Sequence, residues 1–259
     1  MIVSYPAFIR RRAPAWSFIA ASNERRITEM REPEVIGRLK AVLIGKAVPY
    51  TRPGAFSAID KQAVHGRVEV GAEGLAGDEQ GDRRVHGGPD KAVHCYAWAH
   101  YAVWREQIPG SALWQQPGAF GENFSVESLD ESAVCIADQW RVGDAVFEVS
   151  QGRQPCWKLN ERFGVADMSK RVQNSLRAGW YLRVLSPGAV GAGDEIVRVA
   201  CLWPEWTVER LLRAIRDRDC DTVVLRQILE LPLPESWHML FRVRLESGRA
   251  ESWTRRLFG

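Results

Sequence analysis

Short β-branched segments separated by glycine-containing turns run through most of this chain and limit the folds open to it. Residues 35–44 and 65–70 alternate apolar and polar side chains, as half-buried strands do. Further short strands are predicted at 123–126, 133–136, 145–150, 181–185 and 195–199. Turns such as Gly143-Asp144 lie between them. Many short strands with glycine turns favour a β-barrel over a doubly wound sheet, so the predicted fold class is mainly β with some α.

Helices are predicted inside the strand-rich region as well. One is expected to begin at Pro89-Asp90 and to continue to Trp104, with its apolar residues spaced for one buried face. His94 and His100 would lie on this helix six residues apart, which is the wrong spacing for a metal-binding pair. Shorter helices are expected just after Cys156 and over 167–175.

After Pro204 the pattern changes to amphipathic helices. Thr207 is expected to cap a helix over 208–215, and helical patterns follow at 221–230 and 236–245. A helical part of roughly 55 residues is small for an independent core, so we expect it to dock on the barrel.

Three segments follow from these patterns. Residues 1–35 are predicted to be a disordered or misassigned N-terminal extension, with Met30 an alternative start. Residues 36–203 are predicted to form the β-barrel domain, and 204–259 a C-terminal three-helix domain.

Composition is that of a globular protein and argues against several classes. The chain has 259 residues, 46% of them hydrophobic, and a net charge of +3, which is too small to predict binding to polymeric nucleic acid. There is no apolar run of the ~18 residues that a membrane-spanning helix needs. The five cysteines include no CxxC pair, which argues against a disulfide framework or a zinc ribbon. These features suit a reducing compartment, so the expected localisation is cytoplasmic.

The segment Arg153-Gln154-Pro155-Cys156-Trp157-Lys158 carries the main functional signal. It places Cys156 between two cationic side chains, Arg153 and Lys158. The thiolate is the form of cysteine that attacks electrophiles and binds metals, and neighbouring cations stabilise it. The alternative is a buried cysteine that packs as a small apolar residue. The remaining cysteines are interpreted in that second way, namely Cys95, Cys135, Cys201 and Cys220.

A glycine-rich stretch at 74–91 is a second candidate binding element. Glycines let backbone amides approach a ligand, and Arg84, His86 and Lys91 could donate hydrogen bonds to an anion. The alternative is a surface turn whose charges face water.

A third candidate is the segment 117–124. Asn123 could hydrogen-bond a ligand and Glu122 could relay protons. Both residues could equally hold a turn at the start of a strand.

Taken in order, these motifs resemble those of MOSC domains, a module named from the C-terminal regions of molybdenum-cofactor sulfurases. The resemblance is strongest to the YiiM-like proteins associated with resistance to 6-hydroxylaminopurine. The segments that carry it are 74–78, 85–92, 119–123, 149–151, 153–156, 179–180 and 253–257. The chain departs from the family at Gly152, where proline is common, and this is expected to loosen the loop before Cys156.

The resemblance implies a fold, a cofactor and a set of site residues. The fold would be a barrel like the inserted domain of pyruvate kinase, followed by three helices. A molybdenum–pterin cofactor would be bound through the sulfur of Cys156, which would be both metal ligand and catalytic residue. The implied cofactor-binding residues are Lys46, Lys61, His86, Lys91, Asn123, Arg153 and Lys158. Pyridoxal phosphate binding is a further suggestion at family level only.

The resemblance also implies an activity. The substrates would be N-hydroxylated nucleobases and related N-oxygenated compounds, reduced with electrons from a separate flavoprotein or iron–sulfur protein. Breaking an N–O bond needs electrons that side chains do not supply, so the cofactor must carry the redox chemistry. A purine could stack on Trp157 or Trp180.

Two alternatives stay open at this point. In the first, Cys156 carries a persulfide and delivers sulfur for metal–sulfur cluster or cofactor biosynthesis. In the second, the glycine-rich cationic region binds a phosphate ligand without turnover.

Overall fold

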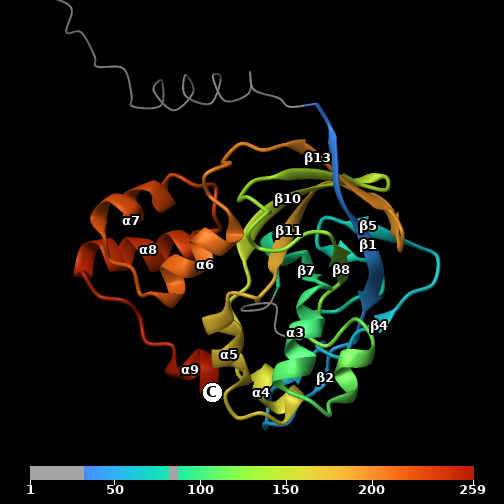
Figure 1. Ribbon diagram of the computed structural model, residues 1–259, viewed down its shortest axis with the longest axis horizontal. Helices are drawn as coiled ribbons and strands as arrows, with labels where there is room; N and C mark the ends of the chain where they lie inside the picture. The colour runs from blue at the N-terminus through green and yellow to red at the C-terminus, as the bar shows by residue number, and fades with distance from the viewer. Residues whose placement is uncertain (1–31, 82–86) are drawn as a thin grey trace, which may run out of the picture. The chain divides into compact units, whose positions relative to one another are not determined.

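A closed barrel of seven strands forms the centre of the protein (Figure 1). The computed structural model describes residues 32–81 and 87–259. The barrel strands are β1 (Glu34–Ile44), β7 (Val93–Ala97), β8 (Phe124–Glu127), β9 (Gln139–Val142), β10 (Ala145–Gly152), β11 (Trp180–Ser186) and β13 (Glu195–Ala200). They are ordered β13-β9-β10-β11-β7-β8-β1, and β1 closes the ring by pairing with β13. The predicted β-barrel is therefore confirmed.

Among the described residues, six short strands lie outside the closed ring of the barrel. They are β2 (Val48–Pro49), β3 (Phe56–Ser57), β4 (Gln62–Ala63), β5 (Arg67–Gly71), β6 (Gly74–Leu75) and β12 (Gly188–Gly191). β4 extends the sheet beside β1, β2 pairs with β3, and β5 lies between β12 and β6. The long loops between these strands reach the region of Cys156.

The helix predicted from Pro89 to Trp104 is wrong in its first half. A single 3₁₀ turn, η1 (Pro89–Lys91), leads into β7, and only α3 (His100–Gln107) is helical. All five residues of β7 are buried, because the strand runs between β8 and β11 and both its faces are covered. Such a strand shows no alternation of apolar and polar residues, so periodicity does not separate it from a buried helix.

The strand predicted at 133–136 is also wrong. Within it, Cys135 makes one isolated bridge to Thr207, and the segment is otherwise irregular. β9 and β12 were not predicted, since each has only four residues and lies close to a turn.

The helical predictions for the rest of the chain are confirmed. The confirmed helices are α4 (Lys158–Phe163), α5 (Met168–Ser175), α6 (Val208–Arg216), α7 (Thr222–Leu229) and α8 (Glu235–Ser247). Two further elements lie outside the predicted helices, namely α9 (Thr254–Phe258) and the 3₁₀ turn η2 (Ala112–Gln115). Thr207 caps α6, since its side chain accepts a hydrogen bond from the backbone N–H of Arg210 at 3.1 Å. Asp221 caps α7 in the same way, by accepting from Val223 and Val224.

The C-terminal helices dock on the barrel, as their small size predicted. In Figure 1, α6, α7 and α8 gather on one side of the barrel, and α9 lies beside α5. α6 packs on β10 and buries Leu211 and Ile215, and one continuous hydrophobic core includes residues of both parts. Because residues 31–259 form one compact unit, the proposed boundary at 203/204 stays a prediction, as does the character of residues 1–35, most of which lie outside the described residues.

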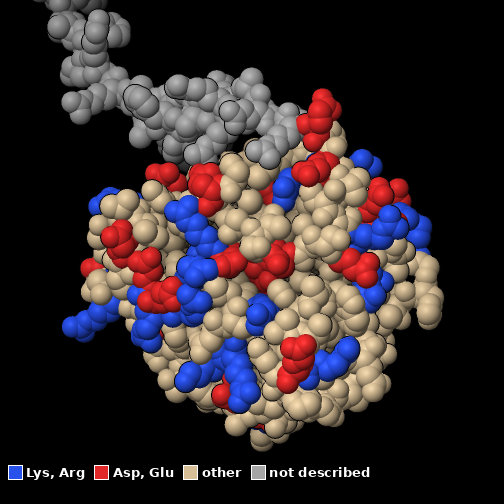
Figure 2. Space-filling view, viewed as in Figure 1, with Lys and Arg blue, Asp and Glu red and all other residues tan. Residues whose placement is uncertain are grey.

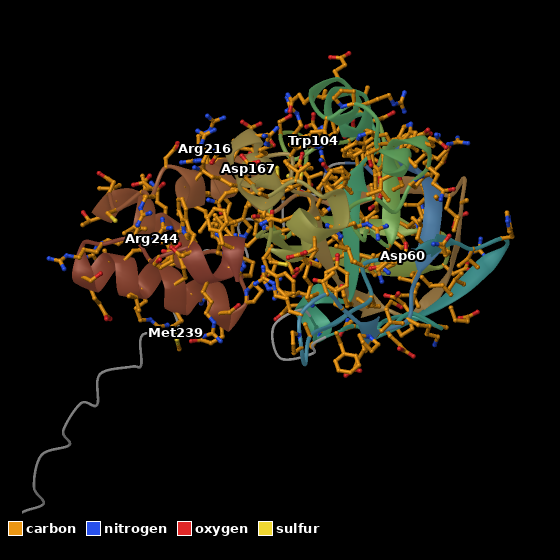
Figure 3. All side chains as sticks on the ribbon, turned by 90° about the horizontal axis from the view of Figure 1, so that it is seen from below. Asp60, Trp104, Asp167, Arg216, Met239 and Arg244 are labelled. Carbon is orange, nitrogen blue, oxygen red and sulfur yellow. The ribbon has the colours of Figure 1, made fainter. Side chains whose placement is uncertain are left out.

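Arg244 organises the inside of the helical part (Figure 3). Its side chain is almost fully buried and donates to the carbonyls of Ala214 at 2.8 Å and Asp219 at 3.1 Å. It also makes two 2.8 Å contacts with the carboxylate of Glu251. One buried cation thus connects α6, α8 and the segment that leads to α9.

On one face of the molecule the charged side chains of both signs are mixed (Figure 2). Figure 2 shows acidic and basic side chains interspersed over the visible face. Within the described residues, no helix has both the length and the apolar character needed to cross a membrane.

Removing the cap of α6 tests how the helical part is anchored. Thr207→Ala should lower the free energy of unfolding by about 1 kcal/mol, because the N–H of Arg210 loses its acceptor. Urea unfolding followed by circular dichroism measures this. Thr222→Ala is the matched control, since Thr222 is an exposed helical residue without a capping role. Equal losses in the two variants would contradict the capping argument.

Candidate functional site

Cys156 lies in the loop between β10 and α4 and is half-buried. It lines two adjoining cavities of about 100 Å³ and about 800 Å³. The residues common to both are Gly81, Lys91, Cys156, Lys158 and Tyr181. The thiol is therefore not enclosed in apolar packing, and the interpretation of Cys156 as an inert core residue is wrong.

The smaller cavity collects most of the residues that the sequence singled out. Those that line it are Lys61, Lys91, Asn123, Arg153, Cys156 and Lys158. They come from loops far apart in the sequence that the barrel brings together. Asp78, His94 and Tyr181 also line it. The sequence motifs included Asp78, but neither His94 nor Tyr181 was predicted to take part.

A buried ion pair forms one wall of the smaller cavity. The ammonium of Lys61 pairs with the carboxylate of Asp78, and both side chains are more than nine-tenths buried. Asp78 also accepts from the N–H of Gly45 at 2.7 Å and from Nδ2 of Asn123 at 2.8 Å. Burial lowers the pKa of Lys61, and the nearby Asp78 carboxylate opposes that effect. The positive charge of Lys61 in this wall is thus already paired with the negative charge of Asp78.

Asn123 is engaged by the protein itself. Its Oδ1 accepts from the N–H of His94 at 3.1 Å, and its Nδ2 donates to the carbonyl of Leu43 at 3.1 Å as well as to Asp78. Asn123 therefore orients the wall of the cavity, and a direct contact with a cofactor stays a prediction.

Glu122 has the structural role that was the alternative to proton relay. It is fully buried and lines neither cavity. Its carboxylate accepts from the backbone N–H groups of Gly118 at 2.8 Å and Phe120 at 3.1 Å, and from the hydroxyl of Tyr101. These bonds hold the turn before β8.

Several buried polar atoms at the cavities lack a partner of normal hydrogen-bond geometry among the described residues. They are Nη1 of Arg153, Nε2 of His94 and both amide atoms of Gln151, which lines the larger cavity. Buried polar groups without a partner cost free energy unless water or a ligand satisfies them. Burial and the nearby Arg153 hold the pKa of His94 well below its usual range, so its imidazole is neutral. The cavities thus present donors and acceptors that a polar ligand can use.

The remaining predicted cations differ in their placement. Burial lowers the pKa of Lys91, while Asp90 and Cys156 oppose that shift. Lys158 donates to the carbonyl of Phe56 at 2.6 Å. Lys46 lines neither cavity and pairs with Glu79 at 3.0 Å on the surface, so the structure does not bring it to the site. His86 lies outside the described residues, and its role stays a prediction.

The larger cavity lies between the Cys156 loop and the C-terminal part of the chain. On the C-terminal side it is lined by Ser236, Trp237, Leu240, Ser252, Arg255 and Arg256. The sequence does not predict that C-terminal residues line the site. The tail enters the prediction only as a segment, 253–257, that resembles the family.

Arg256 fixes the backbone on both sides of the cysteine. Its Nη1 donates to the carbonyl of Pro155 at 2.6 Å, and its own carbonyl accepts from the N–H of Trp157 at 2.8 Å. Burial lowers the pKa of Arg256 to about 10, so it remains a cation at neutral pH. α9 thus positions the thiol and adds positive charge beside it.

The two tryptophans proposed for stacking behave differently. Trp180 is fully buried and packs against Trp140 with ring centres 6.1 Å apart, so it is not available to a ligand. Trp157 lines the larger cavity, and the guanidinium of Arg52 lies 4.0 Å from the centre of its ring. Of the pair, only Trp157 can take the predicted role.

Two glycines allow the close packing around the Cys156 loop. A Cβ at Gly152 would lie 2.8 Å from Leu212 of α6, and Gly152 pairs with Trp180 as the last residue of β10. Gly152 is therefore part of a paired strand, and the loosening expected from glycine at this position stays a prediction. Gly179 has φ +81°, and its carbonyl accepts from the N–H of Arg153 at 2.9 Å.

Removing the charge of Asp78 tests the buried wall of the smaller cavity. Asp78→Asn should lower the free energy of unfolding by about 3 kcal/mol, because Lys61 is left buried without its counter-charge. Denaturant unfolding measures the loss. Glu79→Gln is the neighbouring control, and it should lose much less because the Lys46–Glu79 pair is exposed. Similar losses would contradict the importance assigned to burial.

Comparison with known proteins agrees with this fold. The MOSC domain family matches residues 82–197, and the YiiM-like 3-alpha helix domain matches 206–248. Protein YiiM of Escherichia coli strain K12 is 36% identical over 219 residues, covering 84% of this chain and 97% of that protein. A protein named "Reductase" of Gibberella moniliformis is 36% identical over 82% of this chain, which spans only 36% of that protein's length.

A solved structure supports the same relationship. The crystal structure of YiiM from Escherichia coli superposes with a TM-score of 0.72 at 31% sequence identity, covering 86% of this chain and 99% of that chain. The barrel and the helical part thus match a solved relative over nearly the whole length of that relative. This chain belongs to the YiiM-like MOSC domain proteins.

Proposed function

We propose that this protein is a molybdenum-cofactor-dependent reductase of N-hydroxylated nucleobases and related N-oxygenated compounds. The observation that carries the proposal is the position of Cys156 at the junction of two cation-lined cavities. Membership of the MOSC family, which is associated with the molybdenum cofactor, supports the choice of cofactor. The relative named as a reductase supports the class of reaction.

The residues at the two cavities fit a molybdenum–pterin group. The half-buried Cys156 offers a soft sulfur ligand, which suits a transition metal. The unpartnered Nη1 of Arg153 and the unpartnered amide of Gln151 offer hydrogen bonds to polar atoms of a ligand. Around the larger cavity, Arg255 offers a cationic donor to a phosphate. Arg256 adds positive charge, while its two Nη atoms already donate to Pro155 and Gln173. These are the residues that would hold the cofactor.

The reaction needs two electrons and two protons for each N–O bond, because R–NH–OH becomes R–NH₂ and water. When bound, a molybdenum–pterin cofactor supplies the two-electron chemistry that protein side chains lack. The chain itself contributes binding and orientation. Trp157 offers an aromatic face to a planar base at the larger cavity. Lys91 lines both cavities, and because burial lowers its pKa it is a better proton donor than an ordinary exposed lysine.

The source of electrons is part of the proposal. A separate flavoprotein or iron–sulfur protein would deliver them, and the protein would act in the cytoplasm. Neither a membrane nor polymeric nucleic acid is needed for this activity.

Replacing Cys156 tests the proposal. The full chain is made in a host that synthesises the molybdenum cofactor, and molybdenum and pterin are measured in the purified protein. Wild type should contain both and should reduce 6-hydroxylaminopurine with a chemically reduced dye as donor. Cys156→Ser should lose molybdenum and activity while its circular dichroism is unchanged. Cys220→Ser is the control, because Cys220 lines neither cavity.

Two outcomes would contradict the proposal. Full molybdenum content and turnover in Cys156→Ser would show that Cys156 is not the metal ligand. Alternatively, wild type purified without molybdenum and carrying one extra sulfur atom on Cys156 would favour the sulfur-carrier alternative.

A further inference from the structure

A second group of metal-binding side chains lies away from the cavities around Cys156. The Sγ atoms of Cys135 and Cys201 and a carboxylate oxygen of Asp138 all lie within 4.8 Å of one another. In the part of the chain that the structure describes, no other group of three or more such side chains is this close. None of the three residues lines either cavity.

The spacing and the ligand types suit a thiophilic divalent cation. Zinc binds thiolates at about 2.3 Å and carboxylate oxygens at about 2.0–2.2 Å, so ligand atoms around one zinc ion lie roughly 3.5–4 Å apart. Two sulfurs and one oxygen within 4.8 Å meet this requirement after small side-chain adjustments. Three protein ligands leave one position for water.

Asp138 gives an independent indication of a missing partner. Its side chain is fully buried. Oδ2 accepts from the N–H of Cys135 at 3.1 Å and pairs with Nε of Arg198 at 3.1 Å. The Cys201 thiol and the Trp140 indole N–H lie close enough to donate weakly to this carboxylate, but Oδ1 has no partner of normal hydrogen-bond geometry among the described residues. A buried carboxylate oxygen in this state is costly, and a cation would satisfy it.

The charges also balance around a divalent ion. Two thiolates, the carboxylate of Asp138, the guanidinium of Arg198 and a divalent cation sum to zero. Arg198 is held on the far oxygen of the carboxylate, and its Nη2 donates to the carbonyl of Ala133 at 2.7 Å. It therefore offsets negative charge while Oδ1 stays available to the metal.

The group lies where the barrel connects to the helical part. Cys201 directly follows β13, and Cys135 bridges to Thr207, the cap of α6. Backbone bonds from Ile136 to Trp206 (2.9 Å) and from Val208 to Val134 (2.8 Å) reinforce the same junction. An ion shared by Cys135 and Cys201 would fasten the start of the connecting segment to the barrel.

We propose that Cys135, Asp138 and Cys201 form a structural binding site for a thiophilic divalent cation such as Zn²⁺. The site is separate from Cys156 and independent of the proposed reductase activity. It also revises the sequence-based interpretation of Cys135 and Cys201 as packing residues.

Titration with Co²⁺ tests the site, because cobalt reports thiolate ligation by its absorption. The full chain is reduced, treated with a chelator and titrated. Wild type should develop thiolate-to-cobalt charge-transfer absorption that saturates at one equivalent and is abolished by Zn²⁺. Cys156→Ser and Cys220→Ser should behave as wild type. Cys135→Ser and Cys201→Ser should lose the charge-transfer band, and Zn²⁺ should raise the melting temperature of wild type but not of these variants.

Asp138→Asn keeps the test decisive if a serine variant does not fold. It preserves the shape of the side chain and should weaken cobalt binding at least about tenfold. The proposal is overturned if reduced, folded wild type shows no thiolate–cobalt absorption. It is also overturned if the band is unchanged in Asp138→Asn, or if it is lost in Cys156→Ser and kept in Cys135→Ser and Cys201→Ser.

Discussion

The site depends on hydrogen bonds that two distant segments make to the Cys156 loop. On the barrel side, the N–H of Arg153 donates to the carbonyl of Gly179, the residue just before β11. On the other side, Arg256 of α9 bonds to Pro155 and Trp157. A loop before a short helix would otherwise sample many conformations. Hydrogen bonds at both ends hold the thiol half-buried at the meeting point of two cavities.

The helical part thereby becomes part of the site rather than an appendage. α8 and the tail line the larger cavity, and Arg244 and Glu251 connect the helices to the segment that carries Arg256. α9 is itself fastened to the barrel side, since the carbonyl of Leu257 accepts from Nδ2 of Asn160 and from the hydroxyl of Ser169, each at 2.8 Å. Stability of the helical part and geometry at Cys156 are thus physically linked.

The sequence predicted what local rules control and missed what only tertiary contacts decide. Thr207 caps α6 as its residue type indicated, whereas Asp221, predicted as the first residue of a helix, caps α7. Because both faces of β7 are buried, its sequence resembles that of a buried helix. A helix over these residues does not predict that His94 lines the smaller cavity, where its Nε2 lacks a partner of normal hydrogen-bond geometry among the described residues. Most of the site residues were predicted because a series of motifs, in order along the chain, resembles those of MOSC domains. Lys46 was predicted as a site residue but pairs with Glu79 on the surface and lines neither cavity. No local sequence pattern indicates this pairing. The role of Arg256 depends on a contact across 101 residues of sequence, which no local pattern encodes.

The most direct test is to measure amide hydrogen exchange of the peptide covering 153–159 by mass spectrometry. It reports whether hydrogen bonds from both sides hold the Cys156 loop. Wild type is compared with Arg256→Gln and with Arg249→Gln, whose arginine is exposed and does not contact the loop. The account predicts faster exchange of this peptide in Arg256→Gln alone, with β10 and β11 as protected as in wild type. Equal protection of the peptide in all three proteins would show that α9 does not hold the Cys156 loop.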